Sequence, residues 1–197
     1  MEYLPDEPII ASRRIGIIVA DGYDPIAFNA IYGAIQGAKA IPIVIGTHRS
    51  ETFADGESQS GKGIVPDHHL EGQRSTMFDA LFVPGGKQAI ETLSKNGRAL
   101  HYIREAFGHL KAIGATGEGI LLVEKALQLP TVVTSSDNEA VESYGVVTLK
   151  SVHPERLGEL VSAAKNAKGF LDKFVYAISV HRCWEREIDG LSTMVAY

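Results

Sequence analysis

Short apolar runs alternate along this chain with stretches of helical periodicity, and this alternation constrains the fold more than any other feature. Continuous runs of apolar, often β-branched residues occupy positions 15–20, 41–45, 79–83 and 111–115, and a shorter run occupies 131–133. Runs of this kind are typical of strands that are buried on both faces of a parallel sheet. The sequence therefore predicts several short, buried strands.

Helical patterns separate these runs. Pro25 favours a helix start, and apolar residues continue at helical spacing as far as Ile35. Further helical patterns cover residues 87–95, 98–108, 118–127 and 155–168, whereas residues 46–76 are polar and glycine-rich and predict loops and short strands. Because strands and helices alternate, we expect an α/β fold with a doubly wound, mainly parallel sheet and helices on both faces.

Length and composition fit one domain. The 197 residues suffice for a single α/β domain with a sizeable core. Residues 1–12 carry two prolines and three acids and predict a linker or extended arm, which leaves residues 13–197 as the domain. The single cysteine, Cys183, excludes an internal disulfide. It is compatible with a cytoplasmic location but does not fix the compartment.

Charge and hydropathy exclude two classes of partner. The net charge is −5 and no basic run is present, which argues against a protein that follows nucleic-acid phosphates. No apolar stretch approaches the roughly 20 residues that span a bilayer. The adjacent His68 and His69 would point to opposite faces of an extended segment, so no metal site is expected.

One amphipathic segment lies near the end of the chain. Phe170, Phe174 and Ile178 follow one another at four-residue steps, which predicts a helix with one apolar face. Two interpretations stay open: the helix packs on its own domain, or these three side chains form a contact surface for another chain or domain.

The segment 109–119, HLKAIGATGEG, has the layout of a nucleophile elbow: a strand, a sharp turn of small residues and a helix. Ala115 stands where a catalytic cysteine or serine is expected, and a methyl group cannot act as a nucleophile. Gly117 and Gly119 fit a tight turn that is retained for packing.

Three loops should meet at the carboxyl ends of the strands, where open α/β sheets bind ligands. Their glycines allow close backbone approach, and a helix N-terminus favours an anion. The alternative is that they are only the turns such a fold requires. We call their candidate residues the elbow pocket: Asp24, Gly85, Gly86, Ala115, Thr116, Gly117 and Glu118.

The elbow, together with the segment DALFVPGG at 79–86, resembles the PfpI intracellular-protease superfamily. Members of that superfamily include the parkinsonism-associated deglycase and the class I glutamine amidotransferases. The resemblance implies an acidic residue at the position of Ala27 and a cysteine at the position of Ala115. Because both are alanine here, protease, deglycase or amidotransferase activity is not expected of this chain.

A second resemblance covers almost the whole chain. The segments SRRIGIIVADG at 12–22, PDH at 66–68, 78–86 and CWERE at 183–187 are similar to the C-terminal flavodoxin-like domain of large-subunit catalases, above all those of filamentous fungi. The resemblance implies a tetrameric parent that decomposes hydrogen peroxide, with the catalase core and sister subunits as partners. Haem would belong to that core. None of the seven tyrosines here has the Arg-x-Phe-x-Tyr setting of a haem ligand, so no cofactor is expected in this chain.

The leading hypothesis is therefore a non-catalytic domain that stabilises the oligomer and protects unfolded client proteins, since the PfpI superfamily contains a bacterial heat-shock chaperone of similar fold. The alternative is a weak enzyme, or a small-molecule or flavin sensor, in which Asp24, Thr116 and Glu118 work at the elbow pocket. Against a flavin, Asp21 and Asp24 would repel its phosphate. A third interpretation makes the pocket part of a gate that leads peroxide to the haem core.

Overall fold

The computed structural model describes residues 8–57, 63–150 and 169–195. Within them lies a seven-stranded sheet of order β3-β2-β1-β4-β5-β7-β6. The strands are β1 (Arg14–Ile18), β2 (Ile41–Gly46), β3 (His68–His69), β4 (Ala80–Val83), β5 (Ala112–Thr116), β6 (Val141–Ser143) and β7 (Val146–Leu149). All neighbouring strands are parallel except β6 and β7. The predicted mainly parallel sheet is confirmed.

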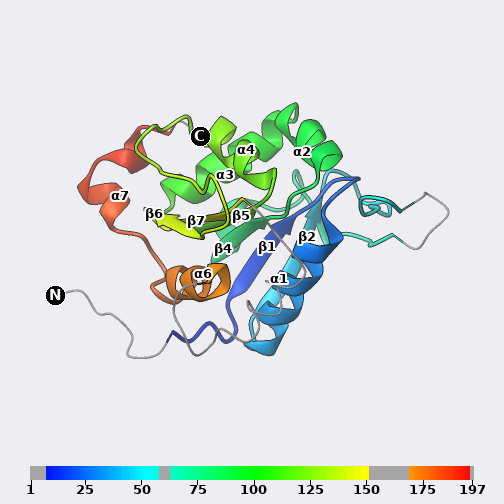
Figure 1. Ribbon diagram of the computed structural model, residues 1–197, viewed down its shortest axis with the longest axis horizontal. Helices are drawn as coiled ribbons and strands as arrows, with labels where there is room; N and C mark the ends of the chain where they lie inside the picture. The colour runs from blue at the N-terminus through cyan, green and yellow to red at the C-terminus, as the bar shows by residue number, and fades with distance from the viewer. Residues whose placement is uncertain (1–7, 58–62, 151–168, 196–197) are drawn as a thin grey trace.

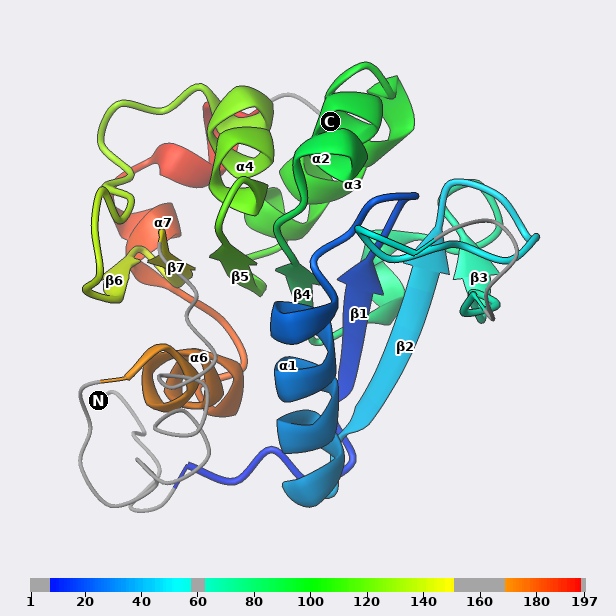
Figure 2. The ribbon, with the colours of Figure 1, turned by 45° about the vertical axis from the view of Figure 1, so that its right-hand side comes forward.

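Helices cover both faces of this sheet (Figures 1 and 2). On one face lie α1 and α6, and on the other lie α2, α3 and α4. The helices are α1 (Pro25–Gly37), α2 (Lys87–Ser94), α3 (Gly97–Gly108), α4 (Gly119–Leu127), α6 (Phe170–Ser179) and α7 (Glu185–Ile188), with short 3-10 turns η1 (Ser75–Met77) and η2 (Leu191–Thr193). The arrangement is the doubly wound, flavodoxin-like one expected from the sequence.

Local capping signals decide where the helices begin. Asp24 caps α1, since its carboxylate accepts hydrogen bonds from the backbone N–H groups of Ile26 and Ala27, and Pro25 takes the first helical position. Asn96 caps α3 in the same manner. The predicted starts of these helices are confirmed to within one residue.

The α6 helix packs into the core of its own domain. Gly114 in β5 carries no side chain, and a Cβ there would lie 2.9 Å from Phe174 and 3.1 Å from Phe170. Phe170, Phe174 and Ile178 are each only 1% exposed. The first interpretation of this segment therefore describes the structure. The second, a contact surface made of these three side chains, is corrected, because the sheet already covers them.

The region after α4 differs from the prediction. Residues 131–133 are not a strand, and Val133 is 58% exposed. The place beside β5 belongs instead to β7, which forms a hairpin with the edge strand β6. Tyr144 and Gly145 connect the two with φ values of 52° and 69°, as a two-residue hairpin turn with positive φ at both positions requires. The helix predicted at 155–168 lies outside the described residues.

The described N-terminal segment rests against the domain. Ile10 is buried and the backbone N–H of Ser12 donates to the carbonyl oxygen of Lys39 at 2.8 Å. Residues 1–7 of the predicted arm lie outside the described part of the chain. No helix of the described residues is long and apolar enough to cross a membrane.

Candidate functional site

Three loops meet at the carboxyl ends of β1, β4 and β5. The backbone N–H of Asp24 donates to the carbonyl oxygen of Gly85 at 2.9 Å. Gly86 has a φ of +111°, and a Cβ at this position would collide with the carbonyl oxygen of Gly22. Only glycine permits so close an approach in this conformation. The Pro84–Gly86 turn is therefore fitted against the loop that leads into α1.

The apex of the elbow is Gly117. Its φ is +55°, and it stands between the end of β5 and the start of α4. A nucleophile elbow carries its reactive residue at this strained apex, with small residues two positions before and after it. In this chain Ala115 and Gly119 are those flanking residues. A Cβ on Gly119 would lie 2.5 Å from the carbonyl oxygen of Val83, so a small residue is required there.

The structure places the positive-φ residue of the turn at Gly117, two residues after Ala115, the position predicted to correspond to the nucleophile. Ala115 is fully buried inside β5, where it pairs with Val83 of β4 and Thr148 of β7. A residue whose backbone pairs with a neighbouring strand on each side lies within the sheet, so its side chain cannot project beyond the end of the strand as a nucleophile at an elbow does. Small residues at positions 115 and 119 flank Gly117 on either side.

Neither position supplies catalytic chemistry. Gly117 has no side chain, although a Cβ there would have its nearest neighbour, the Cα of Gly85, at an ordinary 3.5 Å. Ala27, at the position of the superfamily's acidic residue, is a buried methyl group in the first turn of α1. Gly117, Ala115 and Ala27 thus carry no nucleophilic or acidic side chain.

A carboxylate occupies the place where an active elbow holds its oxyanion. In active elbows the oxyanion hole consists of the N–H of the residue after the nucleophile and an N–H from a second loop. Here these positions are Glu118 and Gly86. The Oε2 atom of Glu118 accepts a hydrogen bond from the Gly86 N–H at 3.0 Å. This bond, aided by the N–H of Glu118 itself, lowers the pKa of the Glu118 carboxyl group.

The other two candidate working residues are engaged elsewhere. The Asp24 carboxylate caps α1 at 2.8 Å from the N–H of Ile26. Thr116 is 2% exposed, and its hydroxyl has no hydrogen-bond partner among the described residues. Strand alternation places Thr116 on the same face as Gly114, which α6 covers. The side chains of Asp24, Thr116 and Glu118 are therefore not joined into a catalytic set.

An apolar groove lies at the far end of α4. It has a volume of about 390 Å³ and opens between the helix and the loop that follows it. The side chains lining it are Val123, Glu124, Leu127, Gln128, Leu129, Pro130, Val132 and Thr134. The hydroxyl of Thr134 donates to Glu124 Oε1 at 2.6 Å at its polar side. Sequence analysis did not predict this groove.

Tyr23, Tyr102 and Tyr144 do not fit a haem ligand. A catalase binds haem iron through a tyrosinate, which requires a lowered tyrosine pKa. Burial raises the pKa of Tyr23 and Tyr102, and the hydrogen bond to Asp189 raises that of Tyr144. Among the residues that the structure describes, no group of three or more His, Cys, Asp or Glu side chains is placed to hold a metal ion.

Comparison with known families decides the relationship. The family described as the C-terminal domain found in long catalases matches residues 11–187. The chain belongs to this family. It is 60% identical over 196 residues to Catalase-1 of Neurospora crassa, which covers 100% of this chain and 26% of that protein. It is 52% identical to Catalase A of Aspergillus fumigatus, covering 100% of this chain and 27% of that protein.

These relatives confirm the predicted resemblance to the C-terminal domain of large-subunit catalases. This chain spans about a quarter of the length of each of these two catalases.

Solved structures confirm the fold. A ThiJ/PfpI family protein from Pseudomonas syringae superimposes with a TM-score of 0.66 at 14% identity, over 95% of this chain and 78% of that one. Schizosaccharomyces pombe DJ-1 gives 0.60 at 18% identity, over 83% and 96%.

Proposed function

We propose that this chain is the non-catalytic C-terminal domain of a large-subunit catalase whose remaining part decomposes hydrogen peroxide. Family membership over residues 11–187 supports the parent activity. The elbow supports the absence of catalysis in this domain, since Gly117 offers no nucleophile and Glu118 occupies the N–H of Gly86.

Haem belongs to the other part of the parent protein in this proposal. The raised pKa values of Tyr23, Tyr102 and Tyr144 support it, because each of these phenols is held protonated. The purified chain should show no Soret absorption after incubation with haemin and gel filtration. A Soret band that stays with the protein would contradict this part of the proposal.

In this proposal the domain binds other proteins. The observation that carries a chaperone-like role is the open apolar groove beside α4, which half-buried Leu129 lines, with exposed Val133 directly after the lining residue Val132 in the chain. Unfolding proteins expose extended apolar segments, and an accessible apolar patch is the kind of surface that binds them. The clients are therefore proteins in the course of unfolding.

A second apolar surface supports the oligomer-stabilising role. Trp184 and Ile188 are 51% and 78% exposed and lie four residues apart, which places them on the same side of α7. Their proposed partners are the catalase core and sister subunits. In the complete catalase, Trp184→Ser with Ile188→Ser should lower the temperature at which the tetramer dissociates, as measured by light scattering.

Suppression of aggregation tests the chaperone-like role. An enzyme that aggregates on heating is incubated with an equimolar amount of this chain, and turbidity is followed. The chain should slow the aggregation, and Leu129→Ser with Val133→Ser should weaken this effect. Ile41→Ser is the matched control, because Ile41 is similarly exposed at 48% but lies on β2. Equal aggregation with and without the chain would contradict the role.

One observation favours the alternative of a small-molecule or flavin sensor at the elbow pocket. The Thr116 hydroxyl is buried without a hydrogen-bond partner among the described residues, which is unusual for a group with no ligand. Two observations argue against an anionic ligand. The carboxylates of Glu118 and Asp24 already accept hydrogen bonds from the backbone N–H groups of Gly86 and Ile26, and their negative charges would repel an anion. Fluorescence titration with flavin mononucleotide tests this alternative, and saturable binding that is lost in Thr116→Val would favour it.

A further inference from the structure

Charged side chains gather at the amino ends of the central strands, on the side of the sheet opposite to the elbow pocket. Arg13, Asp79 and Lys111 immediately precede β1, β4 and β5, which are neighbours in the sheet. Because the three strands are parallel, their amino ends meet at one edge. His181 and Arg182 reach the same edge from the segment that follows α6. We call these five residues the amino-edge cluster.

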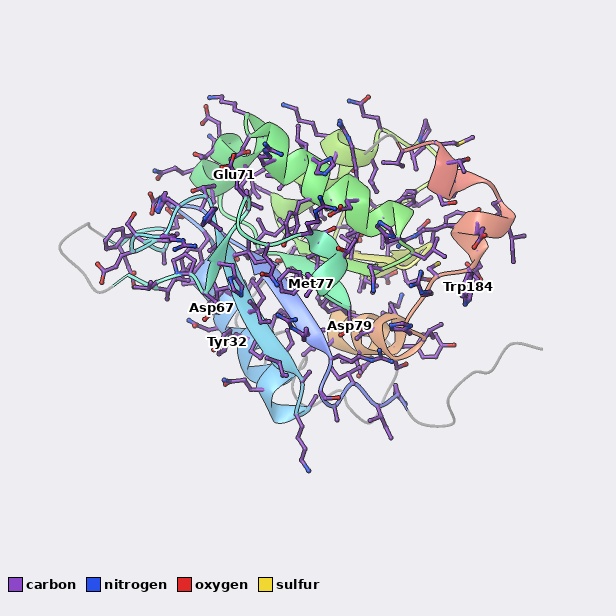
Figure 3. The ribbon with its side chains drawn as sticks, turned by 180° about the vertical axis from the view of Figure 1, so that it is seen from behind. Tyr32, Asp67, Glu71, Met77, Asp79 and Trp184 are labelled. Carbon is purple, nitrogen blue, oxygen red and sulfur yellow. The ribbon has the colours of Figure 1, made fainter. Side chains whose placement is uncertain are left out.

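Asp79 is the centre of the cluster. One of its oxygens lies 3.2 Å from Arg13 Nη1 and 3.5 Å from His181 Nε2. The other accepts a hydrogen bond from the backbone N–H of Arg14 at 2.8 Å. Asp79 lies beside α6 and the amino end of β1 (Figure 3). Both of its carboxylate oxygens are thus already engaged.

Two cations of the cluster lack an acidic partner. Lys111 is only 8% exposed, and its ammonium group makes no hydrogen bond or ion pair within the described residues. Its Nζ atom is not among the buried atoms without a partner, so it reaches solvent. Burial lowers the pKa of Lys111, and Arg182 and Arg13 lower it further, while Asp79 opposes them. Arg182 lies 6.0 Å from the Trp184 ring and forms no ion pair within the described residues. Three cations therefore face one carboxylate, and their mutual repulsion would be relieved by a bound anion.

We propose that the amino-edge cluster is an anion site that binds one oxyanion group, a carboxylate or a phosphate, through Lys111, Arg182 and Arg13. Guanidinium and ammonium groups form their strongest hydrogen bonds to these oxyanions. The group comes from a small free anion or from an acidic side chain on another protein surface.

Titration of the purified chain with inorganic phosphate tests the site. Ionic strength is held constant with chloride, and the His181 ring resonances and the melting temperature are followed. Phosphate should raise the pKa of His181, which burial and the charges of Arg13, Lys111 and Arg182 now lower while Asp79 opposes them. It should also raise the melting temperature. Lys111→Met and Arg182→Gln should each weaken phosphate binding about tenfold, since each removes one charge-assisted contact.

Arg98→Gln is the control, because it removes an equal charge from the exposed start of α3 and should leave phosphate binding unchanged. Without phosphate, Lys111→Met should melt no lower than the original chain, since burial and the repulsion from Arg182 and Arg13 outweigh the attraction between Lys111 and Asp79. If Lys111→Met does not fold, the phosphate binding of Arg182→Gln alone tests the site. Arg182 is only half-buried, so its replacement should not prevent folding.

A glutamate-rich peptide forms the second arm of the experiment. A response to phosphate assigns a small anion to the site, and a response to the peptide alone assigns the carboxylates of a protein surface. Chloride acting as strongly as phosphate and peptide would overturn the proposal. So would unchanged binding in both Lys111→Met and Arg182→Gln.

Discussion

The carboxylate of Glu118 accepts a hydrogen bond from the backbone N–H of Gly86 at 3.0 Å, and it thereby fills the oxyanion position of a nucleophile elbow with a group of the protein itself. The same bond ties the Pro84–Gly86 turn to the start of α4. In this member of the long-catalase family the elbow therefore serves as a clasp between two loops.

Glu118→Gln should weaken this clasp. The folded-state pKa of Glu118 lies below its ordinary value of 4.5. Its contribution to stability is therefore fully present above that value and is lost as the pH falls through the folded pKa. Because the side chain is exposed to solvent, the loss at pH 7 should stay below about 1 kcal/mol.

Urea unfolding at several pH values measures this effect. The difference in unfolding free energy between Glu118→Gln and the original chain should be constant from pH 6 to pH 8 and vanish well below pH 4.5. Glu187→Gln is the control, since Glu187 is an exposed carboxylate on α7. A difference that persists at the acidic end would contradict the clasp.

Gly117→Cys should create an accessible thiol, whereas Ala115→Cys should create a buried one. Gly117 stands at the apex with space for a Cβ, and Ala115 is fully buried within β5. In a Cys183→Ser background, alkylation by iodoacetamide should be at least about tenfold faster at position 117, because reactivity follows exposure of the thiolate. Faster alkylation at position 115 would contradict the burial of Ala115 within β5.

Phe174→Ala should destabilise the domain by about 3–5 kcal/mol, because it leaves a cavity over β5. Gly114→Ala should cost about 1–3 kcal/mol, because the added methyl group would lie 2.9 Å from Phe174. Tyr176→Ala is the control on the same helix, where the ring is 45% exposed. Thermal unfolding of the three variants measures this order, and equal losses would contradict the buried position of α6.

Arg186→Met should destabilise the domain by about 2–4 kcal/mol, because it removes three hydrogen bonds to backbone carbonyl groups in or next to the core. The buried guanidinium donates to the carbonyl oxygens of Tyr144, Phe107 and Lys111 at 2.6, 3.0 and 2.9 Å. Burial lowers the pKa of Arg186 to about 10, so it stays charged at pH 7. Denaturant unfolding, with exposed Arg98→Met as the control, measures the loss. A change within 0.5 kcal/mol, which is about what a surface substitution produces, would contradict this role.

The strands and helices that are marked in the sequence by an apolar run or by a capping residue could be predicted. The apolar runs at β1, β2, β4 and β5 are buried on both faces, and Asp24 followed by Pro25 marks the start of α1. β7 could not be recognised, because Val146–Leu149 is short and becomes a strand by pairing with β5. The similar run at 131–133 has no such partner in the sheet.

The candidate site was predictable in its location but not in its details. Glycines after each strand indicated the loops that meet, whereas the apex at Gly117 depends on how far β5 stays in the ladder. The amino-edge cluster has a sequence signal that was missed. Arg13, Asp79 and Lys111 each stand directly before a buried strand, and parallel strands bring such positions together.

We propose that this domain acts through its apolar surface and not through its elbow. Suppression of the thermal aggregation of a test enzyme by three forms of the chain tests it most directly. The original chain and Glu118→Gln should suppress aggregation equally, while Leu129→Ser with Val133→Ser should lose most of the effect. Loss of suppression in Glu118→Gln, with the groove variant fully active, would contradict the claim.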